Sequence, residues 1–447
     1  MPIDRRRARA GFLRRAALLL LLATIAIAST SGGALGEASP PPSPDVASLA
    51  SRPEVARALA LVVERRDVLI EDWVRIASTP ASSGKEEARA ALVEAALREA
   101  GLESVGRDER GNVLGLIPGR DRSSKRTVLM AHMDTVARPG DDVSVRNDGA
   151  ALRGPGVRDD SSGVAAIVAA ARIVREAGVT PPADVWVVAS VEEEVGLRGA
   201  RHFMDRFGDQ VGAFVGVDGY LGQISYGATG IVWTKMHFRA PGAHTLRSYE
   251  NPSATLAAAR AIEGIYAIKV PREPETIESW INVGMLGGGE VPNAQARDAW
   301  FTVDLRSNDP ATIGSLEKEI LEACRRAAAE VGVAFEAETL QRLEGSRFEG
   351  RRDALIVQTA RAVLEHLGWK EISLTPRGAG DHNLAVLMEI PTVAVGVTTG
   401  DRAHTPQEYA EIAPYEIGLK QIILLIASPL REAGAVGASG GRSDGPP

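Results

Sequence analysis

The order of hydrophobic and polar positions predicts alternating strands and helices over most of the chain. Between about residues 47 and 101, apolar residues recur three and four positions apart, as in amphipathic helices. Short apolar and β-branched runs, typical of buried strands, cover 113–117, 127–130, 184–190 and 213–217. A helical pattern at 163–177 separates two of these runs. The alternation predicts an α/β fold with a mostly parallel sheet and helices on both faces.

The pattern changes after residue 230. The following segments read as strand, helix, strand, strand, helix and strand, at 231–238, 253–268, 281–286, 299–305, 313–331 and 334–340. This order is typical of a ferredoxin-like α+β unit. The α/β pattern then resumes at 353–367, 392–397 and 414–426. We therefore expect a catalytic domain made of 49–230 and 343–432, with an inserted lid or dimerisation domain at 231–342.

The N-terminus has the pattern of a targeting segment. Six arginines precede an apolar run at 16–28, which is shorter than the roughly 20 residues that a bilayer requires. We expect 1–30 to be a secretory signal peptide, with an uncleaved anchor as the alternative. Residues 31–48 and 433–447 have the composition of a flexible linker and tail. The sequence thus predicts export to the periplasm or the medium, without stable membrane association after signal removal.

Composition narrows the class of protein and of partner. With 447 residues, 45% hydrophobic and 24% charged, the chain resembles ordinary globular proteins with room for two domains. Loss of 1–30, which carry net +5, would change the formal charge from −7 to −12. Such an acidic protein is a poor partner for nucleic acid. Its single cysteine, Cys324, excludes an intrachain disulfide and is expected to be a buried thiol.

Five segments rich in carboxylates and histidines follow predicted strands or glycine-rich loops. They are 131–134 with His132 and Asp134, 154–163 with Asp159 and Asp160, 191–196 with Glu193 and Glu194, 217–219 with Asp218, and 403–408 with His404. Each alone has an ordinary interpretation, such as a buried histidine, a helix N-cap or a solvated turn. Together they predict a metal site, because clustered carboxylates and imidazoles need a cation to neutralise them.

The spacing within these segments suits hydrolysis with two metal ions. In His132-Met133-Asp134 an imidazole can bind an ion while the nearby carboxylate orients the ring. Glu193 and Glu194 are adjacent at a strand end, so their side chains point in different directions. One of them can bind a metal while the other takes a proton from water. Two ions about 3.5–4 Å apart lower the pKa of such a water toward ~7.

Order and spacing together resemble the co-catalytic di-zinc exopeptidases that include peptidase T, bacterial glutamate carboxypeptidase and aminoacylase. The resemblance extends over about 58–427 and includes the inserted domain. It implies one Zn²⁺ bound by His132 and Asp218 and another bound by Glu194 and His404, with Asp159 bridging both. Co²⁺ and Mn²⁺ stay open, because nitrogen and oxygen ligands accept several divalent ions.

The same resemblance implies roles around the metals. Asp134 would support His132, Glu193 would be the general base, and the peptide bond between Asp159 and Asp160 would be cis. His244, in the inserted domain, would stabilise the oxyanion of the tetrahedral intermediate, often across a dimer. Its ordinary interpretation is a surface-loop histidine.

Three further residues are implied to contact substrate. Asn293 and Arg306 match the segment that binds the polar terminus of the substrate, for which a guanidinium offers bidentate bonds. The alternative for Arg306 is a strand-end surface residue. Gly380, in the loop 378–381, matches the glycine-rich loop near the substrate backbone.

The chain departs from the family pattern near these substrate residues. His382 stands where a small residue is usual, and Ala296 replaces a proline three residues after Asn293. Leu246-Arg247-Ser248-Tyr249 replaces a run of small residues after His244. None of the implied metal ligands is changed, so the departures concern substrate choice.

We therefore expect an exported zinc exopeptidase that hydrolyses short peptides. Asp218, where glutamate is the alternative, resembles the aminopeptidase and tripeptidase branch. An amidohydrolase of N-acyl amino acids, or a carboxypeptidase, would use the same metal site. A non-catalytic metal- or peptide-binding protein and a scaffold dimer are the hypotheses from other classes. The inserted domain is the expected interface of a homodimer.

Overall fold

The computed structural model describes residues 45–247, 250–272, 277–346 and 351–431. The expected signal peptide, most of the expected linker, Ser248, Tyr249 and the expected tail lie outside these ranges. The predictions made for them are therefore not tested.

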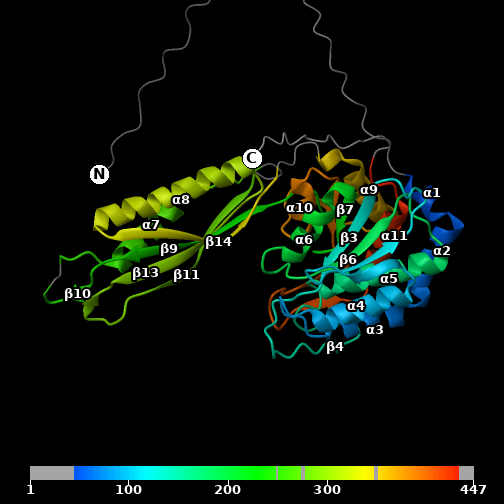
Figure 1. Cartoon of the computed structure of the whole chain (residues 1–447), viewed down its shortest axis with the longest axis horizontal. Helices are drawn as coiled ribbons and strands as arrows, with labels where there is room; N and C mark the ends of the chain where they lie inside the picture. Colours follow the sequence, from blue (N-terminus) through cyan, green and yellow to red (C-terminus); the bar gives the residue numbers. More distant parts are fainter. Residues whose placement is uncertain (1–44, 248–249, 273–276, 347–350, 432–447) are drawn as a thin grey trace, which may run out of the picture. The chain divides into compact units, whose positions relative to one another are not determined.

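The larger sheet lies at the centre of the α/β part of the described chain. Its strand order is β1-β2-β6-β3-β7-β16-β8-β15. In Figure 1 its labelled strands β3, β6 and β7 lie among the helices. The strands are β1 (Glu103–Arg107), β2 (Val113–Ile117), β3 (Arg126–His132), β6 (Val185–Ser190), β7 (Val211–Gly216), β8 (Gln223–Ser225), β15 (Ser373–Thr375) and β16 (Thr392–Val395). The central strands β6, β3, β7 and β16 are parallel, so their carboxyl ends meet at one edge. The mostly parallel sheet is confirmed.

Helices cover both faces of this sheet, because its strands are apolar on both sides. In β3, Leu129 and Ala131 face the core shared with α5 and α11, whereas Val128 and Met130 face the core shared with α6 and α10. The helices of the first face are α1 (Val46–Ala50), α2 (Pro53–Glu64), α3 (Arg66–Ala77), α4 (Glu87–Glu99), α5 (Ser161–Ala177), α9 (Leu355–His366) and α11 (Tyr415–Ala427). Those of the second face are α6 (Arg198–Phe207), which continues into the 3₁₀ turn η1 (Gly208–Gln210), and α10 (His382–Leu387).

Helix α5 brings its first turn against the end of β7. The side chain of Asp160 caps the helix by accepting the N–H of Gly163 at 3.1 Å. A Cβ on Gly163 would lie 2.2 Å from the carbonyl oxygen of Val217, so only glycine permits this approach. The approach brings Asp159 and Asp160 close to the strand end that carries Asp218.

A second, antiparallel sheet has the order β11-β13-β9-β14 and lies against two helices on one face (Figure 1). Its elements, with the short pair β10 and β12, are β9 (Gly230–Arg239), β10 (Ala243–His244), α7 (Ala254–Tyr266), β11 (Ser279–Gly288), β12 (Ala294–Gln295), β13 (Asp298–Ser307), α8 (Pro310–Val331) and β14 (Ala334–Leu343). The predicted β-α-β-β-α-β order is present, with β10 and β12 as additions. Alternate residues of β9 and β13, including Phe238 and Phe301, form a separate core with α7 and α8. Cys324 is buried in that core, as expected.

A third, small sheet was not predicted from the sequence. Its order is β17-β18-β5-β4, with β4 (Arg146–Asn147), β5 (Ala151–Arg153), β17 (Gly400–Asp401) and β18 (Tyr409–Glu411). Strands of two or three residues show no hydrophobic periodicity, which explains the omission. The pairing of β18 with β5 brings residues 403–408 beside the loop that precedes α5. A short 3₁₀ turn, η2 (Arg351–Asp353), precedes α9.

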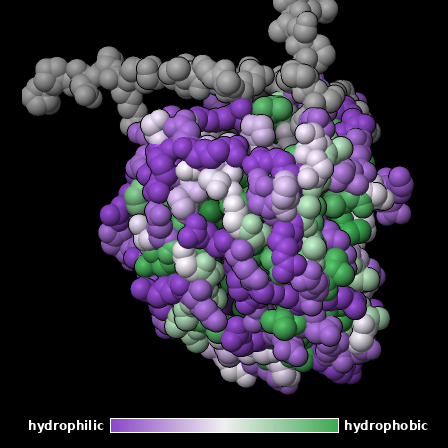
Figure 2. Space-filling model, turned by 90° about the vertical axis from the view of Figure 1, so that its right-hand side faces the viewer, coloured by the Kyte–Doolittle hydropathy of each residue, from purple (hydrophilic) through white to green (hydrophobic). Residues whose placement is uncertain are grey.

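Hydrophilic residues cover most of the face of the molecule that Figure 2 shows. The hydrophobic residues on this face form small separate groups. In the described ranges, none of the helices combines the length and the apolar character that crossing a bilayer requires.

Candidate metal centre

The carboxylate of Asp159 lies between two histidines that are far apart in the sequence. His132 Nε2 lies 3.1 Å from Asp159 Oδ1, and His404 Nε2 lies 3.4 Å from Asp159 Oδ2. His404 Nε2 is also 3.2 Å from Glu194 Oε1. The two oxygens of Asp159 thus face different imidazoles, which is the arrangement required of a bridging ligand.

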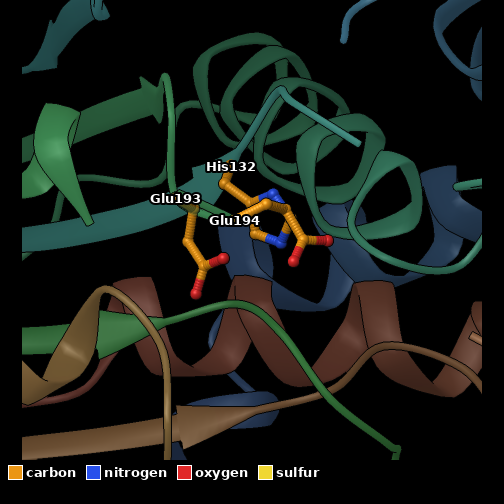
Figure 3. Close-up of side chains that lie close together, drawn as sticks. All are labelled: His132, Glu193 and Glu194. Carbon is orange, nitrogen blue, oxygen red and sulfur yellow. The ribbon is translucent and has the colours of Figure 1, made fainter. Parts of the chain in front are cut away.

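Three overlapping groups have ligand atoms within 4.8 Å of one another. They are Asp159, Glu194 and His404; His132, Asp160 and Asp218; and His132, Glu193 and Glu194. The structure therefore brings together all five predicted metal ligands and the predicted base. Figure 3 shows His132 beside Glu193 and Glu194, whose carboxylates point in different directions.

Asp134 orients both His132 and the turn that carries the two glutamates. His132 Nδ1 is 3.0 Å from the carbonyl oxygen of Asp134 and 3.5 Å from its Oδ1. A ring proton on Nδ1 leaves Nε2 free to bind an ion. The buried carboxylate of Asp134 also accepts the N–H groups of Glu193 and Glu194, at 2.9 and 3.1 Å, and the hydroxyl of Ser83. These contacts are compatible with the supporting role that the resemblance implies for Asp134, which stays a prediction.

Asp159 and Asp160 are adjacent but differently engaged. The peptide bond between them is cis, which confirms the expectation from the resemblance. Asp160 Oδ2 accepts the N–H of His132 at 3.1 Å, and its Oδ1 caps α5. Asp160 thus lies among the ligands, yet its oxygens already hold β3 and α5 in place.

The loop 191–199, which carries Glu193 and Glu194, is closed at its base by a buried asparagine. The N–H of Gly199 donates to the carbonyl of Val191 at 3.0 Å. Asn112 accepts the N–H of Val191 at 3.0 Å and donates to the carbonyl of Gly199 at 2.9 Å. Buried Glu86 accepts the N–H of Glu192 at 3.1 Å. Sequence reasoning missed Asn112 and Glu86, because neither lies near a ligand in sequence.

Negative charge dominates the centre when no cation is present. The carboxylates of Asp159 and Glu194, which lie close to its Nε2, raise the pKa of His404 to about 10. Burial opposes protonation of His132, but Glu193, Asp134 and Asp159 outweigh it and raise its pKa. Burial also raises the pKa of Glu193 and of Asp218, with further increases from neighbouring carboxylates. A bound cation would compensate this negative charge.

One buried oxygen provides a direct test of whether metal ions fit. Glu194 Oε1 is buried and accepts no hydrogen bond from the described residues, although His404 Nε2 is only 3.2 Å away. An ion held by Asp159, Glu194 and His404 would satisfy it. The ligand set of imidazole and carboxylate groups fits zinc and similar divalent ions.

The glycine-rich loop before α10 reaches the centre. A Cβ on Gly380 would lie 3.5 Å from both Asp218 Oδ2 and Glu193 Oε1. The next residue, Asp381, is buried and accepts a hydrogen bond from Ser190, and burial raises its pKa to about 7. The structure thus brings Gly380 beside Glu193, the predicted general base.

His382 lies beneath this loop. Its ring would collide with a Cβ on Gly378 and is close to Gly216 of β7. Burial lowers its pKa to about 4, so the imidazole is neutral near pH 7. The unusual histidine therefore supports the glycine-rich loop from below.

The other predicted substrate residues belong to the second sheet and its short strand pair. His244 in β10 pairs with Ala294 of β12, and the carbonyl of Asn293 accepts the N–H of Thr245. Arg306 in β13 contacts Asp304 at 3.1 Å through Nε and Nη2. Its guanidinium already has a carboxylate partner, which a substrate would have to share. The roles of His244, Asn293 and Arg306 stay predictions.

Comparisons with known proteins agree with this geometry. The sequence model of peptidase family M20/M25/M40 matches residues 128–428. A [LysW]-lysine hydrolase from Deinococcus radiodurans is 26% identical over 345 residues, which are 76% of this chain and 91% of that protein.

Two solved structures illustrate the shared fold. A tripeptidase from Staphylococcus aureus has a TM-score of 0.69 and 21% identity, covering 81% of this chain and 98% of its own. A dinuclear metal-binding peptidase of the M20 family from Bacillus subtilis has a TM-score of 0.63 and 16% identity, covering 81% and 97%.

Proposed function

Because the chain belongs to peptidase family M20/M25/M40, a family of hydrolases that act on peptide or amide bonds, we propose that it is a di-zinc exopeptidase. Its substrates are short peptides, from which it releases the N-terminal residue. The observation that carries the proposal is the carboxylate of Asp159 between His132 and His404, with Glu193 beside them.

The metal ions have defined ligands in this proposal. His132 and Asp218 would hold one ion and Glu194 and His404 the other, with Asp159 as the residue that both would share. When bound, the two ions supply Lewis acidity that activates a water and polarises the scissile carbonyl. Asp134 keeps the imidazole of His132 in the orientation that binding requires.

The protein's own groups move the proton. Glu193 takes a proton from the attacking water at its carboxylate and later passes it to the leaving amine. Its backbone is fixed by Asp134 and its loop is closed by Asn112, so the carboxylate is held in position for both transfers. His244 and Arg306 are proposed to bind the oxyanion and the substrate terminus, respectively.

A second candidate is an amidohydrolase that releases an amino acid from a larger acyl group. The relative from Deinococcus radiodurans, which is a hydrolase of [LysW]-lysine, favours this alternative. The same ligands and the same base would serve either reaction, since both cleave an amide bond.

A substrate screen with the zinc-loaded protein separates these functions. The panel contains tripeptides with a free N-terminus, the same tripeptides with an acetylated N-terminus, and N-acetyl amino acids. An aminopeptidase releases the first residue of the free tripeptides only, which amino acid analysis detects. Faster turnover of N-acetyl amino acids would favour the amidohydrolase. Two bound zinc ions without cleavage of any of the three would contradict both enzymes and favour a binding protein.

Export and dimerisation complete the proposal. The arginine-rich start and the apolar run at 16–28 support secretion. When the full-length chain is expressed, we expect a product without 1–30 in a periplasmic or extracellular fraction. Exposed Met285 and Leu286 on the edge strand β11 support a homodimer through the second sheet. Light scattering after size exclusion tests the dimer, and a single-chain mass would contradict it.

A further inference from the structure

The chain that carries His404 continues into a buried glutamate, Glu408, whose role the ligand set leaves open. Glu408 lies immediately before β18, and its side chain is almost fully buried. Its N–H donates to the carbonyl of Thr405, which closes the turn after His404. The conformation of the His404 loop is thus tied directly to Glu408.

The carboxylate of Glu408 binds the loop that carries Asp159. Oε2 accepts the N–H of Gly156 at 2.7 Å, while Oε1 accepts the N–H groups of Arg158 and Asp159 at 2.9 and 2.8 Å. The main-chain carbonyl of Glu408 accepts the N–H of Gly154 at 3.0 Å. One residue thus accepts four backbone N–H groups from a single loop.

These bonds replace strand pairing where the strands end. The ladder between β18 and β5 stops at the pair Tyr409 and Arg153, after which the loop turns toward α5. The N–H groups of that loop have no strand partner, and an ionised carboxylate can accept several of them. Hydrogen bonds to a charged acceptor are stronger than neutral ones. The loop therefore depends on Glu408 for its shape.

A buried cation balances the charge of this arrangement. Arg158 is buried, stacks over the ring of Tyr220 at 4.2 Å and donates to the carbonyl of Gly219 at 2.9 Å. Its guanidinium also approaches Asp159 Oδ2 at 3.5 Å. Arg158 thus links the Asp159 loop to the segment after Asp218, while Glu408 links the same loop to His404.

We propose that Glu408 is a positioning residue that holds the bridging carboxylate of Asp159 in register with His404. The inference rests on the proposed metal centre. Loss of its carboxylate weakens the ion held by Asp159, Glu194 and His404 more than the ion held by His132, Asp159 and Asp218. The first ion then loses the geometry of two of its ligands. The second keeps His132 at the end of β3 and Asp218 just after β7, both of which are central strands.

Zinc titration of the chelator-treated full chain tests this role. Glu408→Gln keeps the shape but places an amide N–H₂ against backbone N–H groups, so at least one of the three side-chain bonds is lost. We expect wild type to bind two ions, and Glu408→Gln to bind one normally and the other at least about tenfold more weakly. Calorimetric titration and competition with a chelator measure both affinities.

Glu411→Gln is the matched control. Glu411 lies in the same strand, β18, but its exposed carboxylate accepts only the hydroxyl of Thr399 among the described residues. Both ions should bind it as they bind wild type. Equal affinities in Glu408→Gln and Glu411→Gln, or equal weakening of both ions in Glu408→Gln, would overturn the proposal.

A second variant and the melting temperature of the metal-free protein separate a positioning role of Glu408 from a loss of folding. If Glu408→Gln does not fold, Glu408→Asp is titrated instead under the same criteria, since it retains the charge but falls short of the loop. A purely structural role predicts a lower melting temperature of the metal-free protein with both zinc affinities unchanged, which contradicts the proposal. Absence of hydrolysis in wild type would contradict the proposed peptidase function. It would not contradict this inference, because the zinc titration does not depend on turnover.

Discussion

His132 and His404 lie at opposite ends of the proposed metal centre, and the protein supports them in different ways. His132 ends a central strand, its side chain is 3% exposed, and both of its ring nitrogens lie close to carboxylates. His404 lies in a loop between two short strands, with a φ of 64° and a side chain that is 55% exposed. The half around His132 is built by the large sheet, whereas the half around His404 depends on loops that are bound to one another. Rigidity of the whole centre is therefore set by its exposed half.

Removal of the base that serves both halves should have the largest effect. Glu193→Gln removes the proton acceptor but leaves the ligands, so kcat should fall by roughly 10²–10⁴-fold. Zinc content should stay at the wild-type value, because the substitution leaves the proposed metal ligands around His132 and His404 unchanged. Peptide hydrolysis and elemental analysis measure the two quantities.

Glu192→Gln serves as the control for that substitution. Glu192 is next to the base but pairs with Arg110 and Arg198, away from the ligand groups. Its activity should stay near that of wild type. Full activity of Glu193→Gln would refute the assignment of the base.

The two histidines should differ in what they contribute to the metal-free fold. His132→Ala leaves buried partners unsatisfied and should lower the free energy of unfolding by about 1–3 kcal/mol. His404→Ala removes a side chain that is 55% exposed, so solvent screens its ion pairs with Asp159 and Glu194, and it should lower the metal-free melting temperature less than His132→Ala does. Calorimetry of the two chelated variants checks this. Equal melting temperatures would show that the buried half is no better preformed than the exposed one.

The number of protons released when zinc binds should reflect the protonation of both His132 and His404. With a pKa of about 10 in the metal-free protein, His404 is charged at pH 7, and the pKa of His132 is also raised. Zinc must displace these protons, so binding of two ions should release about two of them and tighten as pH rises. In the metal-free protein, the free energy of unfolding should depend on pH in the opposite direction. The ion pairs of His404 raise it below pH 6.5, and this contribution is lost as the pH rises toward 10.

Calorimetry in buffers with different ionisation heats counts the released protons. His404→Ala should release about one proton fewer than wild type. An unchanged proton count in that variant would contradict the assignment of His404 as a protonated ligand in the metal-free protein.

We expect the smallest effect on activity from a substitution in the glycine-rich loop, which approaches both sides of the centre. Gly380→Ala adds a methyl group 3.5 Å from Asp218 and Glu193, so it should lower kcat/KM on the order of tenfold by displacing substrate. Zinc affinity should not change. Gly314→Ala in α8, where no atom lies within 4 Å, is the control and should keep full activity. A loss of zinc in Gly380→Ala would show that the loop supports the metals rather than the substrate.

Much of this centre was accessible from the sequence because its ligands follow strongly apolar strands. The run at 113–117 coincides with β2, and the strands before His132, Glu193 and Asp218 are all present. Parallel strands carry such residues to one edge, so convergence follows from the fold. The order of strands and helices in the inserted domain could also be predicted, because each element is long enough to show its hydrophobic periodicity.

The residues that the sequence could not reveal are those that act through loop conformation. Asn112 and Glu86 bind backbone groups of the 191–199 loop, and Glu408 binds a loop about 250 residues earlier in the chain. Hydrogen bonds to the backbone leave no spacing pattern in the partner segment. The pair of Arg306 with Asp304 was also hidden, although the two are neighbours on one face of β13.

The ligands are spread along the chain from His132 to His404, and Glu408 follows them all. During synthesis, a nascent chain that has been made as far as β16 already holds His132, Asp159, Glu194 and Asp218, yet it lacks both groups that complete the exposed half. In the proposed centre, such an unfinished chain lacks a ligand of the second ion. Products truncated before His404 are therefore expected to be inactive.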